Sequence, residues 1–381
     1  MEDMGRIHYF LGAPAPKGFY SLYGRLADQA ETVYILKGGP CCGKTELLRR
    51  TARRSEELGE QVEYILCPSD PERLDGLVLP ERRVALIDGT APHVVEPMCP
   101  GGVERYVDLS GAYDHAALRP LRGDLTSCLT AVRDHQRRVG RCLGAAEEIS
   151  RDVRAILTTP ELREKAARRA QGIIRRESRA KIGGSGQVRQ FFLDAVTARG
   201  LLRLEETART LCRRLYVLED SWGLAHVLLA HLLGGAAAAG YSVIACPSPL
   251  SPGRLRHLLI PELSLGFLSA DPALPDPDKG WRTVNMDAMT GGAARRPSRP
   301  RLRFAKKMTR ALLDEAAQAV AQAGDAWAAT EALYCPHVDP AWTERAAQRL
   351  NEEIFGEALD LPLRHTSVSY THLTLPTTPY V

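Results

Sequence analysis

The sequence predicts an α/β fold in which a mostly parallel β-sheet lies between two layers of helices, and in which this unit occurs twice. Two observations lead to this expectation. Apolar segments of strand length alternate with amphipathic segments of helix length along the 381 residues. Segments of the first half also recur in the second half in the same order.

The first half opens with a short apolar strand. This strand, a Gly/Pro turn and the start of an amphipathic helix together make up residues 7–26. Lys17 lies in this turn, where a solvated lysine and a lysine near a ligand are both compatible with the pattern. The stretch from Val33 to Leu48 holds five residues suited to a buried strand, a glycine-rich loop and the beginning of a helix. This helix stops at Gly59.

The glycine-rich loop reads Gly38, four residues, then Gly43-Lys44-Thr45, which matches the phosphate-binding pattern G-x-x-x-x-G-K-[ST]. Glycines let backbone N–H groups turn toward phosphate oxygens, and the helix directs its positive end to the same anion. We expect Lys44 to contact the β- and γ-phosphates and Thr45 to bind Mg²⁺. The nucleotide-binding residues predicted are Gly38, Gly39, Pro40, Cys41, Cys42, Gly43, Lys44 and Thr45. The pattern indicates a P-loop NTPase, and ATP is favoured because no N-K-x-D guanine motif occurs.

Two further strands follow, at residues 61–67 and 84–88, with a helical turn and a β-like segment at residues 71–83 between them. The last strand ends at Asp88, so we expect this carboxylate to hold Mg²⁺ through water beside the phosphate loop. The alternative is an aspartate that caps a turn, since Asp-Gly is a common turn pair.

Gly89 stands where many hydrolytic ATPases carry a glutamate that activates water. Four residues near strand ends are candidates to replace that glutamate, although each also suits a turn cap or a surface charge. These candidates are Asp70, Asp75, His93 and Glu96. The catalytic residues that we predict are Lys44, Thr45 and Asp88.

Composition and charge narrow the class of protein. The formal net charge is only +4, and no apolar run approaches the ~18 residues that a membrane span needs. The first residues lack the apolar core of a signal peptide. The nine cysteines show no C-x-x-C spacing, and a disulfide or zinc site at the adjacent Cys41 and Cys42 is not expected. We therefore expect a reduced, cytoplasmic protein without a membrane partner.

Residues 123–180 change to helical character, broken at Pro160, and predict a long antiparallel helical hairpin. Its second arm is strongly basic, which suits either a solvated face or an acidic partner such as nucleic acid. The low aromatic content argues against base stacking. The basic residues are Arg163, Lys165, Arg168, Arg169, Arg175, Arg176, Arg179 and Lys181. Residues 181–187 read as a linker.

The second half repeats the first at one constant spacing: residues 190–200 align with 8–18, and residues 215–229 align with 33–47. Its loop does not bind phosphate in our interpretation. An acid ~4 Å from a phosphate costs on the order of 4 kcal/mol, whereas a helix terminus returns only ~0.3–2 kcal/mol. The replacements are Asp220 for Gly38, Ala225 for Gly43, His226 for Lys44, Val227 for Thr45 and Ser269 for Asp88.

We interpret this half as a nucleotide-free copy that either packs against the first site or lends it an arginine, for instance Arg254, Arg256 or Arg295. The remaining chain predicts a Pro/Gly-rich loop at residues 271–281 and a strand at residues 281–286. A basic loop at residues 291–301 and helices at roughly 304–323 and 340–358 complete it.

The phosphate-loop motif, the Pro16-Lys17-Gly18-Phe19 segment, the IDGTAPH stretch that begins at Ile87 and the duplication together resemble a bacterial family of uncharacterised tandem P-loop ATPases. The resemblance covers residues 7 to about 358 and implies two P-loop NTPase-like domains, each with a helical insertion. Members often carry an intact loop in both halves. This chain departs from that pattern, which puts a two-site mechanism in doubt.

The expected organisation is therefore a P-loop NTPase domain at residues 1–180, the linker, and a degenerate repeat at residues 188–364. Residues 365–381 resemble an adaptor read-through peptide, so we expect them to be non-native. The expected function is ATP·Mg²⁺ binding with slow hydrolysis. A small-molecule kinase and a non-hydrolysing regulatory module are the alternatives, and nucleic-acid-stimulated turnover is a weaker one. The sequence does not reveal the coupled process, a protein partner or the oligomeric state.

Overall fold

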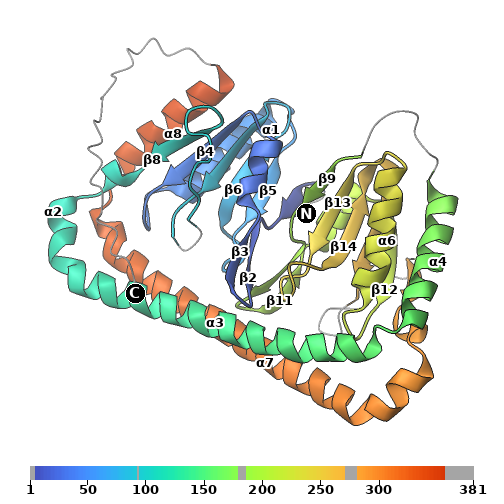
Figure 1. Ribbon diagram of the computed structural model, residues 1–381. Helices are drawn as coiled ribbons and strands as arrows, with labels where there is room; N and C mark the ends of the chain where they lie inside the picture. Colours follow the sequence, from blue (N-terminus) through green and yellow to red (C-terminus); the bar gives the residue numbers. More distant parts are fainter. Residues whose placement is uncertain (1–4, 92–93, 179–185, 271–280, 357–381) are drawn as a thin grey trace, which may run out of the picture.

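The computed structural model describes residues 5–91, 94–178, 186–270 and 281–356. His93, Arg179, Lys181, most of the expected linker and the tail at residues 365–381 lie outside the described residues. The described chain forms an α/β structure with two six-stranded, mostly parallel sheets (Figure 1). No helix in these ranges combines the length and the apolar character that crossing a membrane requires.

The two sheets have the same strand order, which confirms the predicted duplication. The first sheet is ordered β1 (Ile7–Tyr9), β5 (Glu63–Leu66), β6 (Leu74–Leu79), β7 (Val84–Asp88), β4 (Thr32–Lys37) and β8 (Glu104–Asp108). The second is ordered β9 (Val188–Gln190), β13 (Val243–Pro247), β14 (Leu255–Ile260), β15 (Leu265–Ser269), β12 (Arg214–Glu219) and β16 (Arg282–Asn285). Only the third strand of each sheet, β6 or β14, runs antiparallel to its neighbours.

Burial explains the central strands and the helices beside them. Strand β4 buries Val33 to Leu36 on both faces, as expected for a parallel strand covered on both sides. Helix α1 (Lys44–Glu57) buries Leu47, Leu48 and Ala52 against the sheet, at helical spacing. It stops where Gly59 adopts a φ of 78°, a left-handed conformation that glycine accepts readily.

A small hairpin follows the first strand of each repeat. In the first repeat it is formed by β2 (Gly12–Ala15) and β3 (Gly18–Ser21), and in the second by β10 (Asp194–Thr197) and β11 (Gly200–Arg203). Gly18, with a φ of 106°, closes the turn as predicted, but the start of a helix predicted after it is wrong, because residues Gly18–Ser21 pair with Gly12–Ala15 as a strand. Only a 3₁₀ helix at Tyr23–Asp28 follows.

The two repeats meet at equivalent residues. Phe10 and Phe192 exchange two backbone hydrogen bonds, of 3.0 and 2.8 Å, so the contact is reciprocal. Tyr9 stacks on Phe191 with ring centroids 4.5 Å apart. All four side chains are buried, and they belong to one hydrophobic core that continues from the first sheet into the second. The repeats thus share a core in which equivalent residues meet, as they do at the interface of a two-fold symmetric dimer.

Long helices connect the two sheets and pack against one another across the two repeats. The main ones are α3 (Arg122–Leu157), α4 (Pro160–Glu177), α6 (Ala225–Ala238), α7 (Gly292–Tyr334) and α8 (Pro340–Phe355), with the short α2 (His115–Leu118) and α5 (Glu205–Leu211). Figure 1 shows α3 and α7 side by side along one edge of the molecule, in opposite directions. Arg138 pairs with Glu315 and Arg301 with Asp152 across them.

The predicted antiparallel hairpin within residues 123–180 is wrong. Helix α3 pairs with α7 of the other repeat, whereas α4 turns away and packs on α6 (Figure 1). In the same way α8 packs on α1, so the last helix of each repeat covers the sheet of the other. The predicted loop at residues 291–301 is also wrong, because α7 begins at Gly292 and contains Pro297 and Pro300. Each proline costs a backbone hydrogen bond, and burial of Leu302 and Ala305 offsets part of that cost.

Candidate functional site

The glycine-rich loop of the first repeat joins the end of β4 to the start of α1. Gly43 precedes the helix with a φ of 79°, and Cys41 also has a positive φ of 62°. A Cβ atom at Gly38 would lie 2.6 Å from the sulfur of Cys42, so a larger residue there would have to displace the Cys42 side chain. The sequence thus folds locally into the strand, tight loop and helix that its pattern predicts.

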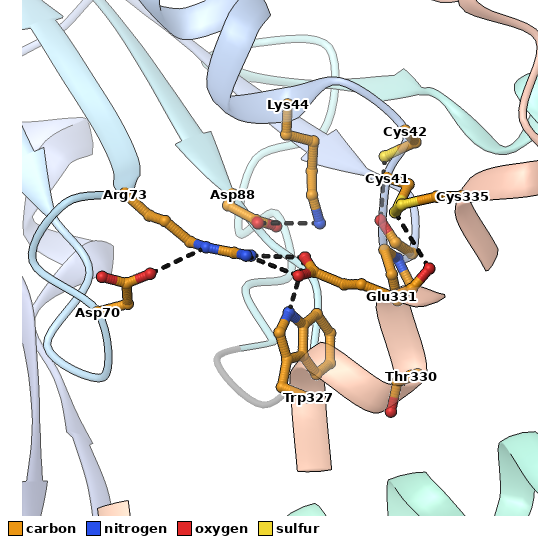
Figure 2. A network of polar contacts seen from close by, with 12 residues as sticks. Cys41, Cys42, Lys44, Asp70, Arg73, Asp88, Trp327, Thr330, Glu331 and Cys335 are labelled. Carbon is orange, nitrogen blue, oxygen red and sulfur yellow. Dashed lines mark hydrogen bonds and ion pairs between the residues drawn. A yellow bond between two sulfur atoms is a disulfide. The ribbon is translucent and has the colours of Figure 1, made fainter. Parts of the chain in front are cut away.

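Lys44 and Asp88 meet over this loop. Asp88 ends β7, which pairs in parallel with β4 so that Leu36 and Asp88 are register partners. The Lys44 Nζ atom lies 2.9 Å from Asp88 Oδ2 and 2.8 Å from both the carbonyl oxygen of Gly38 and the hydroxyl of Thr90. Figure 2 shows the amine of Lys44 and the carboxylate of Asp88 facing each other beside the loop that carries Cys41 and Cys42. The structure therefore brings together the two residues that sequence reasoning placed in one site.

These residues border a cavity of about 980 Å³. Every described loop residue from Gly39 to Thr45 lines it, as do Asp70, Asp75 and Asp88. Thr45 is half-buried on the first turn of α1. The cavity is closed on its other sides by residues of α3 and α7 and by the turn of the β10–β11 hairpin. It therefore lies between the two repeats.

Asp75 is the most perturbed carboxylate of the cavity. It is buried, and its Oδ2 atom accepts a hydrogen bond of 3.1 Å from the Tyr23 hydroxyl. Burial, with repulsion from Asp88 as the next cause, raises the pKa of Asp75 to about 7. A carboxylate with a pKa near neutrality can accept a proton under ordinary conditions and act as a general base.

The other predicted base candidates differ from Asp75. Asp70 lines the cavity, is exposed, and pairs with Arg73 at 3.1 Å. Glu96 does not line the cavity and pairs with Lys37 at 2.8 Å, and the hydrogen bond from Lys37 lowers its pKa. His93 lies outside the described residues. Geometry and pKa therefore select Asp75 from the three candidates that the structure describes.

Helix α7 contributes a set of residues that sequence reasoning missed. Glu331 forms a bidentate pair with Arg73, at 2.6 and 2.7 Å, and accepts a hydrogen bond of 3.1 Å from the Trp327 indole (Figure 2). Cys41 forms a disulfide with Cys335, directly after α7. The expectation of fully reduced cysteines is therefore wrong at this pair. The two cysteines are 294 residues apart, and nothing in their spacing indicates the contact.

Arg199 is the arginine that the second repeat brings to the cavity. It lies at the turn of the β10–β11 hairpin, lines the cavity, and approaches Glu72 at 3.9 Å. The three arginines suggested from the sequence are elsewhere: Arg254 and Arg256 line a second cavity, and Arg295 donates to the carbonyl oxygen of Asp287. The alignment with Lys17 in the first repeat was the available sequence signal for Arg199.

In the second repeat a carboxylate fills the corresponding loop. The two oxygens of Asp220 accept hydrogen bonds of 2.8 Å from the Leu224 N–H and 2.7 Å from the Ala225 N–H, at the start of α6. These are the backbone donors that a bound phosphate would use in an intact loop. The Asp220 side chain therefore satisfies the backbone donors at the helix N-terminus. The second repeat also lacks the equivalents of Lys44 and Asp88.

Metal binding by protein side chains alone finds no support, because no group of three or more His, Cys, Asp or Glu within the described ranges is arranged for it. A hydroxyl at Thr45 and a carboxylate at Asp88 nevertheless suit Mg²⁺, which usually takes one or two protein oxygens together with waters and phosphates. Comparison with known proteins found no matching family model, no similar curated protein and no similar solved structure.

Proposed function

We propose that the first repeat binds ATP with Mg²⁺ and hydrolyses it slowly. The observation that carries this proposal is the meeting of Lys44 and Asp88 at one end of a cavity of about 980 Å³. That volume suits a nucleotide, since small-molecule sites usually measure about 300–1,000 Å³. The loop between β4 and α1 supplies backbone N–H groups, and Lys44 supplies a charge for the β- and γ-phosphates.

The ion pair of Lys44 and Asp88 has to open when the nucleotide binds. Lys44 then turns from the carboxylate to the phosphate oxygens, and Asp88 becomes free to accept hydrogen bonds from water bound to the metal. Thr45 and Asp88 would hold Mg²⁺, which supplies positive charge at the phosphates. Asp75 takes the role of general base in this proposal, because its pKa of about 7 lets it accept a proton from water.

A direct test measures ATP binding by calorimetry and phosphate release with Mg²⁺ for the wild type and Lys44→Ala. We expect the variant to lose at least about tenfold in affinity, or ~1.4 kcal/mol, and all turnover. Lys37→Ala is the matched control, because Lys37 ends the strand that leads into the loop but does not line the cavity. Equal ATP affinity in the wild type and Lys44→Ala would contradict the proposal, as would the absence of ATP binding.

The same measurement separates the two alternatives. The cavity extends from the loop past Asp70 to Trp327, which leaves room for an acceptor beside a nucleotide and favours a small-molecule kinase as the second candidate. A kinase would bind ATP and release ADP without free phosphate once its acceptor is added. A regulatory module would bind ATP tightly without releasing either product.

A further inference from the structure

A second cavity, of about 630 Å³, lies in the second repeat at the position that corresponds to the first. The loop from Asp220 to Gly223 and the start of α6 border it, together with residues of α3 and α7. Because Asp220 already binds the amide groups at the start of α6, this cavity cannot hold a phosphate on its loop as an intact phosphate loop does. Any ligand must be held by side chains.

The charged side chains of this cavity are mostly cationic. Six lining residues are Arg or Lys and three are Asp or Glu. The cations are Arg154, Arg199, Arg254, Arg256, Lys306 and Arg310, and the anions are Glu147, Asp220 and Asp314. His226 also lines the cavity and adds no positive charge near neutral pH, because burial lowers its pKa to about 4. An excess of positive charge remains.

Some of these cations have a carboxylate partner. Arg154 pairs with Glu147 at 2.5 Å, Arg310 pairs with Asp314 at 3.0 Å, and Arg256 pairs with Asp194. Arg254 instead places its guanidinium 3.0 Å from Nε2 of the neutral His226. Within the described residues neither Arg254 nor Lys306 forms an ion pair. Among the residues that the structure describes, these two side chains are the cations of the cavity without an ion-pair partner, and Asp220 is the anion that has only backbone amides as partners.

Three buried polar atoms of lining residues also lack a hydrogen-bond partner among the described residues: the Nε atom of Arg154, the indole nitrogen of Trp222 and the Oε2 atom of Glu147. Arg154 is only 6% exposed and packs against Gly223, where a Cβ atom would lie 3.6 Å from its Nη1. Buried donors of this kind are rare in folded proteins, and each calls for an acceptor. One of the three atoms is a carboxylate oxygen, so the case for an anion rests on Arg254 and Lys306.

We propose that the second repeat binds a small phosphorylated anion in this cavity, with Arg254 and Lys306 as its ion-pair partners. A ligand with two or more negative charges in a small volume matches the charge excess. Guanidinium groups bind phosphate and carboxylate oxygens alike in a bidentate manner, and only the phosphate can carry two negative charges on one group. This proposal does not depend on ATP binding by the first repeat.

The test titrates inorganic pyrophosphate into the full chain carrying Lys44→Ala, which disables the first site, and measures binding by calorimetry. We expect binding that falls at least tenfold when Arg254→Gln or Lys306→Ala is added. Lys307→Ala is the matched control, because Lys307 is the next residue on α7, is equally exposed and does not line the cavity. Thermal unfolding checks that each variant is folded, and Lys306→Ala removes only an exposed side chain.

Tryptophan fluorescence gives a second readout, since pyrophosphate should change the emission of the protein but not of a Trp222→Phe variant. A parallel titration with fructose 1,6-bisphosphate distinguishes an organic phosphate, which would bind more tightly, from inorganic pyrophosphate. Absence of binding by both probes would overturn the proposal. Equal affinity in the Arg254, Lys306 and Lys307 variants would also overturn it, because the anion would then bind elsewhere.

Discussion

Cys41, in the middle of the glycine-rich loop, is joined by a disulfide to Cys335, which directly follows the long helix α7. The bond connects the loop of the first repeat to an element of the second. Glu331 strengthens the same connection, because it pairs with Arg73 and its carbonyl oxygen lies 3.5 Å from the Cys41 sulfur. The candidate site is therefore held together by both repeats.

Loss of this disulfide should lower thermal stability. Closing a loop of 294 residues restricts the unfolded chain, and removing a native disulfide typically costs about 2–5 kcal/mol. We expect Cys335→Ser to unfold at a lower temperature than the wild type, and reductant to lower the wild type to the same level. Cys99→Ser is the control, because Cys99 is exposed and free. If reductant still lowers the unfolding temperature of Cys335→Ser, the stabilisation does not come from this disulfide.

The sequence predicts the parts of the site that depend on local pattern. The strand, loop and helix around Lys44 and the position of Asp88 follow from apolar runs and glycines, and the second repeat follows from its constant spacing. The sequence does not predict which elements pack against α3, α4, α7 and α8. An amphipathic pattern indicates only that one face of a helix is buried, and not which helix packs against that face. The contact of Cys41 with Cys335 depends on that same exchange of helices between the repeats, whereas Arg199 comes from the β10–β11 hairpin.

Arg199 should contribute to turnover more than to binding. An arginine from a neighbouring unit can stabilise the charge that develops on a transferred phosphoryl group. We expect Arg199→Ala to lower kcat by at least about tenfold while ATP affinity changes little. Lys17→Ala is the matched control, since Lys17 occupies the equivalent hairpin turn of the first repeat and does not line the cavity. A similar decrease in both variants would show that the effect is not specific to Arg199.

Asp75→Asn should abolish most turnover and leave ATP binding intact. Removal of a general base usually costs about 10²–10⁴-fold in rate, and asparagine keeps the shape and the hydrogen bond from Tyr23. Turnover of the wild type should rise with pH through about 7, where Asp75 loses its proton. A variant that retains wild-type kcat would exclude Asp75 as the base. Asp70→Asn serves as the control for the loss of one carboxylate from the same cavity.

The same substitution should change how stability depends on pH. Burial first and Asp88 second raise the pKa of Asp75 from an ordinary value of 3.8 to about 7. Between about pH 4 and pH 7 the folded protein therefore keeps a proton that the unfolded chain has released, so the free energy of unfolding falls as pH rises. At about 1.4 kcal/mol per pKa unit, the cost at pH 8 reaches a few kcal/mol.

Asparagine carries no charge at any pH in this range, so Asp75→Asn avoids the cost of a buried charge. We expect Asp75→Asn to gain stability relative to the wild type between pH 4 and pH 8, with the gain complete above pH 7. Urea unfolding of both proteins at several pH values in this range measures the difference directly. Lys44 and Asp88 are retained in both proteins, so the two proteins differ in sequence only at Asp75. A difference that stays constant from pH 4 to pH 8 would show that the carboxyl group of Asp75 ionises normally in the folded protein.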